Sequence, residues 1–413
     1  MKVLWITNVM LPDACEALHL PPTVVGGWMC GYRDALLKYH SDVELHIVSP
    51  YSQDKTCDVT TPLAHHYLFP QATIQGKWFE EIYDQVKPDV IHIHGTEFPH
   101  SLLWAETCGM QKTLVSVQGL VSQIAERYMG GLRKDELRCS WSLNDYRYRR
   151  TLQQQLARMM ERGLSEVNLL KQAQHIAGRT TWDRKNALAI NPKAQYHKLQ
   201  EILRQDFYAD GIHWQLGQCQ RHSIFISQCY YPIKGLHRLL DAMPQIITQY
   251  PDTQLYVVGE DGRRQHWWHR TQYANILAKK MKGFGSHVHY LGFLSAEQMI
   301  EQYRRAHVFV CPSAIENSSN SVCEAQMIGT PVVAANVGGM ADLIEHEKSG
   351  MLYDFEETDK LAAHICKLFA DNELADKFST NERQAARLRH DRRSTSDTLY
   401  NIYREICDKA DKI

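Results

Sequence analysis

Two glutamates with an unusual spacing are the first candidates for chemistry in this sequence. Glu316 and Glu324 stand eight positions apart, with small polar residues between them, in the stretch SAIENSSNSVCEAQMIGTPVV. The apolar run 307–313 is typical of a buried strand, and Gly329, soon followed by a proline, is typical of a helix end. The pattern therefore predicts Glu316 in the loop after a strand, an N-cap at Asn320 or Ser321, and Glu324 in the first turn of a helix.

The start of this predicted helix can bind an anion. Its first backbone N–H groups and the positive end of the helix dipole suit a phosphate or diphosphate, and small side chains let the ligand approach the backbone. Carboxylates at either side can accept hydrogen bonds from hydroxyl groups, each contributing about 1.5 to 3 kcal/mol. The spacing thus fits a sugar joined to a nucleoside through a diphosphate. In the alternative interpretation, Glu324 only complements the helix dipole and Glu316 is a solvated loop residue.

Lysine and glycine residues near other strand ends are further candidates. Lys234 follows the strand-like run 223–229 and precedes a helix, so its ammonium group can reach an anion at the edge of the sheet. Gly26 and Gly27 precede a helix after the first strand, where glycines let backbone N–H groups approach a phosphate or a sugar. A surface charge and an ordinary turn are the alternatives.

Polar residues near the ends of other first-half strands are weaker candidates. His92 and His94 alternate with isoleucines, so both lie on one side of a strand. No third ligand stands nearby and the chain has no Asp-x-Asp motif, so we expect no metal. His94 is a candidate acceptor-site residue or base, although a packing histidine fits equally. Arg179 can contact the donor phosphate or form a salt bridge between domains.

The elements that position these residues alternate along the chain. Short β-rich runs and longer helical runs recur in both halves, which is the pattern of βαβ units around parallel sheets. We predict an α/β protein with two Rossmann-like, doubly wound domains facing across a cleft. The expected ranges are an N-terminal domain at 1–210, a linker at 211–222, a C-terminal domain at 223–380, and helices at 381–413 that cross back to the first domain.

Two of the expected helical segments carry further detail. The stretch 140–174 has helical character throughout. The C-terminal stretch places apolar residues, among them Leu388 and Tyr403, at helical spacing. Ligands of open parallel sheets bind beyond the carboxyl ends of the strands, so the cleft between the domains is the expected site.

The charge is balanced overall but uneven along the chain. Lys and Arg number 46 against 47 Asp and Glu, so no global field attracts nucleic acid or a membrane. Residues 127–162, however, hold nine basic and four acidic residues, interleaved with Trp141, Tyr146 and Tyr148. Such a first-domain surface suits anionic lipid or a polyprenyl-diphosphate acceptor, while an ordinary charged helix surface is the alternative. The acidic stretch 341–376 argues against nucleic acid as a partner.

Cysteine usage and the N-terminus indicate the compartment. The eleven cysteines are scattered and include no Cys-x-x-Cys pair, which favours reduced thiols. The first residues form no signal-peptide core, and no segment approaches eighteen apolar residues. We therefore expect an unexported cytoplasmic protein, with possible peripheral contact at the inner face of the membrane.

The motifs resemble a known family. Glu316 and Glu324 reproduce the E-x7-E signature of retaining glycosyltransferases with the GT-B fold, and the stretch 312–353 resembles glycosyltransferase family 4. The run YYPIKGLHRLLDAM, the run LYVVGED and the Gly26–Gly27 pair extend the resemblance to both halves. It implies that Glu324 holds the nucleotide ribose, that Glu316 holds a hydroxyl of the transferred sugar, and that Lys234 contacts the diphosphate without a metal cofactor.

The chain departs from the family pattern at two places. The family carries an Arg five or six residues before the lysine, whereas this chain has Gln228 and Cys229 there. Arg263 or Arg264 is then the candidate for the second cation. Many relatives carry a His at the strand tip where this chain has Gln118, which can hydrogen-bond the sugar or acceptor but takes no proton at neutral pH.

The resemblance predicts a retaining, metal-independent transfer from a UDP- or GDP-linked sugar to a glycan or lipid-linked acceptor, in bacterial surface polysaccharide or glycoconjugate synthesis. A UDP-sugar 2-epimerase of the same architecture and a non-catalytic nucleotide-sugar binding protein remain alternatives. A nicotinamide-dependent dehydrogenase is disfavoured because no G-x-G-x-x-G follows the first strand of either half.

Overall fold

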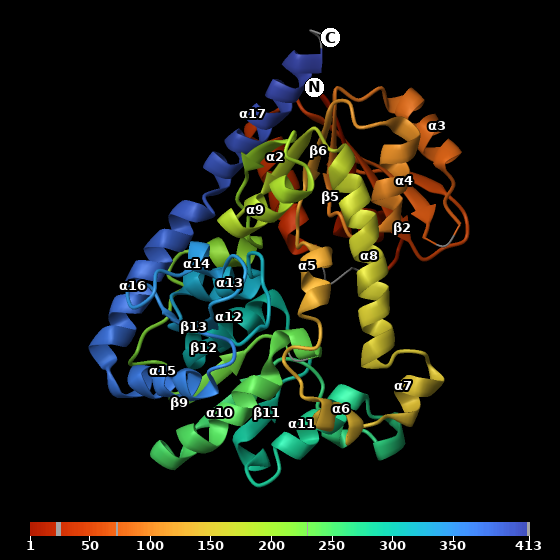
Figure 1. Ribbon diagram of the computed structural model, residues 1–413. Helices are drawn as coiled ribbons and strands as arrows, with labels where there is room; N and C mark the ends of the chain where they lie inside the picture. The colour runs from red at the N-terminus through yellow and green to blue at the C-terminus, as the bar shows by residue number, and fades with distance from the viewer. Residues whose placement is uncertain (22–25, 72, 229, 411–413) are drawn as a thin grey trace. The chain divides into compact units, whose positions relative to one another are not determined.

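The computed structural model describes residues 1–21, 26–71, 73–228 and 230–410, which form two compact units (Figure 1). Unit 1 contains Met1–Gln123, Met160–Arg204 and the C-terminal residues from His390 onward. Unit 2 contains Ile124–Met159 and Gln205–Arg389. Both units are therefore built from segments that are separate in the sequence.

Unit 1 is built on an eight-stranded sheet with the order β3-β4-β2-β1-β5-β6-β7-β8. All neighbouring strands pair in parallel except β3, which is antiparallel to β4. The strands are β1 Lys2–Ile6, β2 Glu44–Tyr51, β3 Cys57–Thr60, β4 His65–Pro70, β5 Val90–His94, β6 Thr113–Ser116, β7 His175–Gly178 and β8 Gln195–Lys198. Every residue of β5 is buried, as expected for a central strand covered on both faces.

Helices cover this sheet and complete the core of unit 1. Trp104 and Phe79 pack with strand residues such as Ile91 in one apolar cluster. The C-terminal helix α17 packs against α2, and the Tyr403 hydroxyl lies 3.0 Å from Trp5 Nε1 and 2.7 Å from His92 Nδ1. The helices with residues in this unit are α1 Pro12–Ala17, α2 Gly27–Tyr39, α3 Gly76–Val86, α4 Pro99–Cys108, α5 Val121–Glu126, α8 Leu152–Gln172, α9 Thr181–Ile190 and α17 Arg392–Ala410.

Unit 2 is built on a six-stranded, fully parallel sheet with the order β11-β10-β9-β12-β13-β14. The strands are β9 Gln220–Ile226, β10 Gln254–Val257, β11 Val288–Tyr290, β12 Ala306–Cys311, β13 Val332–Ala335 and β14 Met351–Tyr353. The order reverses beside β9, so the carboxyl ends of β9 and β12 mark the switch point where open α/β sheets bind ligands.

Unit 2 has α-helices and short 3-10 turns between its strands. The α-helices are α10 Leu236–Gln249, α11 Gln272–Lys280, α12 Ala296–Arg305, α13 Asn320–Ile328, α14 Met340–Leu343, α15 Thr358–Ala370 and α16 Asn372–Arg389. The 3-10 turns are η1 Gln205–Tyr208, η2 Pro232–Lys234, η3 Gly262–Arg264, η4 Trp267–His269 and η5 Gly285–His287.

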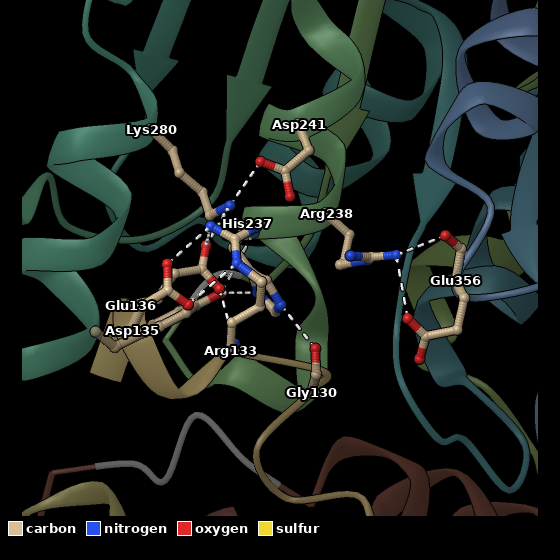
Figure 2. Close-up of polar contacts among 10 residues, drawn as sticks. Gly130, Arg133, Asp135, Glu136, His237, Arg238, Asp241, Lys280 and Glu356 are labelled. Atoms are coloured by element: carbon tan, nitrogen blue, oxygen red, sulfur yellow. Dashed lines mark hydrogen bonds and ion pairs between the residues drawn. The ribbon is translucent and has the colours of Figure 1, made fainter. Parts of the chain in front are cut away.

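The segment 124–159 packs with unit 2 through two short helices, α6 Lys134–Arg138 and α7 Leu143–Arg147. Figure 2 shows part of the attachment: His237 Nε2 lies 2.7 Å from the Gly130 carbonyl oxygen, and Lys280 Nζ pairs with Glu136 at 2.7 Å and Asp241 at 2.6 Å. Burial lowers the pKa of His237 to about 4, so the ring is neutral and can donate to the carbonyl.

The predicted α/β architecture with two parallel-sheet domains is confirmed. The boundaries differ from the expected ranges, because 124–159 lies within the expected 1–210 but packs with unit 2. The helical stretch expected at 140–174 divides into α7 and α8. The hairpin β3–β4 and the edge strand β8 were not predicted, since each of these runs is only four to six residues long.

The expected linker 211–222 is docked onto unit 2. Trp214 is only 3% exposed and donates from Nε1 to the Ala306 carbonyl oxygen at 2.7 Å, while β9 already begins at Gln220. Its Gly- and Gln-rich composition resembled a linker, but one buried Trp is enough to fix such a segment to a core.

Helix α16 buries a different face from the one its apolar residues predicted. Leu388 is 75% exposed, whereas Phe378, Glu382 and Ala386 are fully buried. Both carboxylate oxygens of Glu382 lack a hydrogen-bond partner among the described residues, and burial raises the pKa of this carboxyl well above its ordinary value.

Glu382 is expected to make stability fall as pH rises. The unfolded chain releases this proton near pH 4.3 while the folded chain retains it, so the free energy of unfolding declines above that pH by up to about 1.4 kcal/mol per pH unit. Glu382→Gln should remove this contribution. The free energy of unfolding, measured by urea titrations across pH 4 to 9, should therefore rise for the variant relative to the wild type as pH rises. The exposed Asp376→Asn on the same helix is the control. Parallel curves for wild type and Glu382→Gln would contradict the expectation.

Candidate functional site

A small pocket in unit 2 lies at the carboxyl ends of β9 and β12. Its lining includes Gln228, Lys234, Ser313, Glu316 and Ser321. It therefore brings together three of the residues predicted from sequence, Lys234, Glu316 and Ser321.

A close ion pair is the central feature of the pocket. Lys234 Nζ lies 2.6 Å from Glu316 Oε1, and both side chains are largely buried. Burial lowers the pKa of the Lys234 ammonium, but the Glu316 carboxylate more than offsets this, so the pKa is raised above its ordinary value. Lys234 is thus a fixed positive charge across the neutral range.

The backbone around Lys234 is fixed by a tight contact. Gly235 follows the η2 turn with φ +70°, and a Cβ added there would lie 1.7 Å from the Pro312 carbonyl oxygen. Only glycine fits this position, because the turn both needs a left-handed conformation and touches the loop that follows β12. The loop holding Lys234 and the loop holding Glu316 are therefore packed backbone to backbone.

Glu316 is held from both its side chain and its backbone. Ser313 Oγ donates to Glu316 Oε1 at 2.8 Å, and the Gly339 N–H donates to the Glu316 carbonyl oxygen at 3.0 Å. A Cβ on Gly338 would lie 1.9 Å from that same oxygen. The sequence reasoning missed Ser313 and this glycine pair, although the run NVGG after β13 is a signal for such a close approach.

The helix after the Glu316 loop begins at Asn320, one or two residues earlier than predicted, and its cap is different. The N-cap is Ser319, which makes no side-chain capping bond, rather than Asn320 or Ser321. Glu324 consequently occupies the fifth helical position, beyond the first turn. The expectation failed because capping preference separates serine from asparagine only weakly in a run of such residues.

Glu324 is buried in the structure rather than solvated. It is 8% exposed, and the Tyr303 hydroxyl lies 3.2 Å from its Oε2 and 3.1 Å from the Ser321 carbonyl oxygen. Tyr303, on α12, was missed because nothing in the sequence links it to α13. A buried, hydrogen-bonded carboxylate is well placed to accept further hydrogen bonds from a ligand in a fixed direction.

The two glycines after the first strand lie in unit 1 at the start of α2. Gly26 is the N-cap with φ +89°, and Gly27 is the first helical residue. A Cβ on Gly26 would lie 2.7 Å from Val9 Cγ2, and one on Gly27 would lie 2.8 Å from Arg204 Cγ. Packing within unit 1 therefore already accounts for both glycines, whatever ligand the helix start binds.

The histidine pair of β5 is buried. His92 is satisfied by Tyr403 and by Ser116 Oγ at 2.6 Å, so it is a packing histidine. His94 is 2% exposed beside Trp5, and neither of its ring nitrogens has a hydrogen-bond partner among the described residues. Burial lowers the pKa of His94 to about 3, which leaves a neutral ring at physiological pH.

Gln118 and Arg179 meet in unit 1. Arg179 Nη2 donates to the Gln118 carbonyl oxygen at 2.6 Å and lies 3.2 Å from its Oε1, while Nη1 pairs with Glu201 at 2.6 Å. Arg179 and Glu201 are both buried. The salt bridge of Arg179 is therefore made inside unit 1.

Arg263 does not join Lys234. Its guanidinium pairs with Asp261 through Nε at 2.8 Å and Nη2 at 2.9 Å, and it lines a separate cavity of about 260 Å³. Arg264 is exposed. Gln228 does lie in the pocket of Lys234, and Cys229 lies outside the described residues.

The described residues include neither a metal-binding cluster nor a helix that could cross a membrane. No group of three or more His, Cys, Asp or Glu side chains in ranges 1–21, 26–71, 73–228 and 230–410 is placed to hold a metal ion. Within those same ranges, no helix has the length and apolar character needed to span a bilayer.

The fold of the two units is one that solved glycosyltransferase structures share. Two α/β units with parallel sheets, and a polar pocket at the switch point of the second, have the GT-B fold of glycosyltransferases. Residues 220–371 match the family model described as Glycosyl transferases group 1. The matched stretch contains Lys234, Glu316 and Glu324.

Sequence relatives match over less than half their length. A putative glycosyltransferase, YtcC, of Bacillus subtilis is 27% identical over 183 residues, covering 44% of this chain and 44% of the relative. A D-inositol 3-phosphate glycosyltransferase of Corynebacterium urealyticum is 30% identical over 174 residues, covering 42% of this chain and 41% of the relative.

Solved structures match over nearly the whole chain. Sucrose-phosphate synthase from Thermosynechococcus elongatus has a TM-score of 0.71 at 16% identity, with 98% of both chains covered. Anabaena Alr3699/HepE in complex with UDP and glucose has a TM-score of 0.65 at 16% identity, covering 98% of this chain and all of the other. At such low identity the likeness establishes the fold.

Proposed function

We propose that this protein is a retaining, metal-independent glycosyltransferase that moves a sugar from a nucleoside diphosphate sugar to a hydroxyl group of a glycan or lipid-linked acceptor. The observation that carries the proposal is the Lys234–Glu316 pair beside the start of α13, inside the stretch that matches Glycosyl transferases group 1. A cation, a helix start and a carboxylate are together what a sugar diphosphate requires.

The chemistry follows from the charges. As the bond between the anomeric carbon and the diphosphate oxygen breaks, negative charge grows on the diphosphate, and the Lys234 ammonium and the N-terminus of α13 stabilise it. The acceptor hydroxyl attacks the anomeric carbon from the side of the leaving group and passes its proton to a phosphate oxygen. Glu316 positions a hydroxyl of the transferred sugar and does not attack. Glu324 holds the ribose of the nucleotide.

The donor and acceptor are named at the level of class. HepE has been crystallised in complex with UDP and with UDP-glucose, and one relative is a GDP-mannose-dependent mannosyltransferase. A UDP- or GDP-linked hexose is therefore the proposed donor. The proposed acceptor is a glycan or polyprenyl-diphosphate-linked sugar used for bacterial surface polysaccharide or another glycoconjugate, and the proposed location is the cytoplasm.

The donor site is tested by ligand-induced stabilisation. The wild-type protein is heated with UDP-, GDP-, ADP- and dTDP-sugars, and one nucleotide class should raise the melting temperature. Glu324→Gln, which keeps the volume but removes the charge, should weaken donor binding about 10- to 100-fold because it loses hydrogen bonds to a charged acceptor. Tyr303→Phe should have a smaller effect. The exposed Glu301→Gln on α12 is the control and should behave as wild type.

Each outcome of this test leads to a different conclusion about the site. A shift that Glu324→Gln leaves intact would assign this glutamate a structural role, and no shift with any nucleotide sugar would contradict the proposal. Product analysis then follows: transfer with retention at the anomeric carbon supports it. An isomerised nucleotide sugar formed without acceptor would identify an epimerase instead, and binding without turnover in any acceptor mixture would identify a binding protein.

A further inference from the structure

Two neighbouring segments of unit 2 expose an unusual number of aromatic side chains. Trp141, Tyr146 and Tyr148 belong to the segment 124–159 and are 60 to 66% exposed, while Trp267 and Trp268 belong to the η4 turn and are 65% and 47% exposed. We call these five residues, with the half-exposed Leu143, the aromatic surface. Soluble proteins rarely leave such a group uncovered unless it binds something.

The two segments of the aromatic surface are held side by side by polar side chains. Ser142 Oγ donates to the Arg270 carbonyl oxygen at 2.7 Å, and Asn144 Nδ2 donates to the His269 carbonyl oxygen at 2.7 Å. The Gln272 N–H donates to Asp145 Oδ2 at 2.6 Å, capping α11. Figure 1 shows α6, α7 and α11 in this part of unit 2.

In the segment around α7, polar side chains are buried and neighbouring apolar side chains are exposed. The polar residues Ser142, Asn144 and Asp145 are at most 7% exposed, whereas Trp141 and Leu143, on either side of Ser142 in sequence, are 60% and 50% exposed. A segment that folded for its own stability would bury its aromatic residues and expose its polar ones. Here the polar residues serve as anchors, which leaves the aromatic residues free for a partner.

The surroundings of the aromatic surface are strongly basic. Residues 137–150 and 262–282 together hold ten Lys or Arg and a single acidic residue, Asp145, and no acidic residue lies between Asp261 and Glu297. Asp145 is buried against the start of α11 and pairs with Arg150, so it offers no exposed negative charge. Arg147 and Arg150 also lie over the Tyr148 ring. Lys280 and Arg263 are paired with carboxylates outside these stretches. The exposed positive charge therefore comes from other residues, among them Arg138, Arg147 and Arg264.

We propose that this aromatic surface docks the protein onto a membrane that carries anionic lipids. Trp and Tyr rings favour the boundary between acyl chains and head groups, and exposed Lys and Arg beside them attract anionic head groups. A glycan would need hydrogen-bond acceptors as well as donors around the rings, and the one carboxylate in these two stretches, Asp145, is buried. A single-stranded nucleic acid would need aromatic rings that are free to stack with its successive bases. Trp268 instead packs on His266, with ring centroids 3.6 Å apart.

The experiment is flotation of the full chain with lipid vesicles, in the absence of any nucleotide sugar. Vesicles of phosphatidylcholine alone are compared with vesicles that also contain phosphatidylglycerol. The wild-type protein should bind the anionic vesicles at least about tenfold more tightly, and added salt should weaken this binding. Brominated acyl chains should quench part of its tryptophan fluorescence, which shows that indole rings reach the bilayer.

Two variants and a control locate the binding. The triple variant Trp141→Ser, Trp267→Ser and Trp268→Ser should lose at least about tenfold in vesicle affinity and lose the quenching. The triple variant Arg138→Gln, Arg147→Gln and Arg264→Gln should lose the preference for phosphatidylglycerol. The control combines Leu388→Ser with Lys377→Gln, both exposed on α16 of the same unit, and should bind as wild type. Unchanged thermal unfolding of each variant shows that it is folded.

Every other result overturns the proposal. Failure of the wild type to bind anionic vesicles, equal loss in the control, or full binding by the aromatic variant would each exclude docking by this surface. If the aromatic variant instead loses turnover on a soluble oligosaccharide acceptor without vesicles, the surface binds glycan. Vesicle binding is measured without donor or acceptor. It can therefore fail while the proposed transfer activity is confirmed, and it can succeed while that activity is absent.

Discussion

Replacing Lys234 with methionine is expected to lower kcat/KM for sugar transfer about 100- to 1,000-fold, the usual loss when one group that stabilises developing negative charge is removed. Methionine has nearly the volume of lysine without its charge. The diphosphate would then leave with only the start of α13 to stabilise it. Lys234→Arg should retain part of the activity, because a guanidinium keeps the charge in a different shape.

The structure offers a matched control for this variant. Lys360 pairs with Glu357 at 2.7 Å, but both side chains are largely exposed. Lys360→Met should leave kcat/KM unchanged and have little effect on the free energy of unfolding, because exposed ion pairs contribute little to stability. Steady-state kinetics of the three variants, with thermal unfolding beside them, checks the expectation. Activity of Lys234→Met within threefold of wild type, about 0.7 kcal/mol in barrier, would exclude the role of Lys234.

Gly235→Ala is expected to be the most destabilising small substitution in unit 2, by about 3 kcal/mol or more. Two effects combine: the left-handed backbone at φ +70° is unfavourable for alanine, and its Cβ would lie 1.7 Å from the Pro312 carbonyl oxygen. The loops of Lys234 and Glu316 would have to separate, so donor binding should weaken as well. Urea unfolding measures the loss of stability, and donor-induced thermal shifts measure the weakening of donor binding.

Gly211→Ala separates the two effects. Gly211 has φ +76°, yet a Cβ there meets nothing within 4 Å among the described residues. Gly211→Ala should therefore lower the free energy of unfolding by about 1 to 2 kcal/mol, through the backbone conformation alone. If both variants lost the same stability, the close approach of Gly235 to Pro312 would contribute nothing, and the packing of the two loops would need another explanation.

The site was predictable where local signals suffice. The apolar run before Glu316, the presence of a helix after the Glu316 loop and the end of that helix at Gly329 follow from strand patterning and helix-stop preferences. The choice among neighbouring small polar residues for the N-cap was wrong, because several of them satisfy the same preference. His94 was a candidate acceptor-site residue or base, and it is buried beside Trp5, since residue type alone does not set how many layers cover a strand end.

The sequence by itself determined the alternation of strands and helices, the two parallel sheets, and the spacing of Glu316 and Glu324, because these depend on side-chain periodicity and on contacts within a few residues. Only the tertiary structure decided that Lys234 pairs with Glu316, 82 positions away, and that the segment 124–159 packs with unit 2. Such contacts depend on strand order and on buried polar anchors such as Asp145. Many strand orders satisfy the same periodicity, and the one adopted is set by the packing of the whole chain.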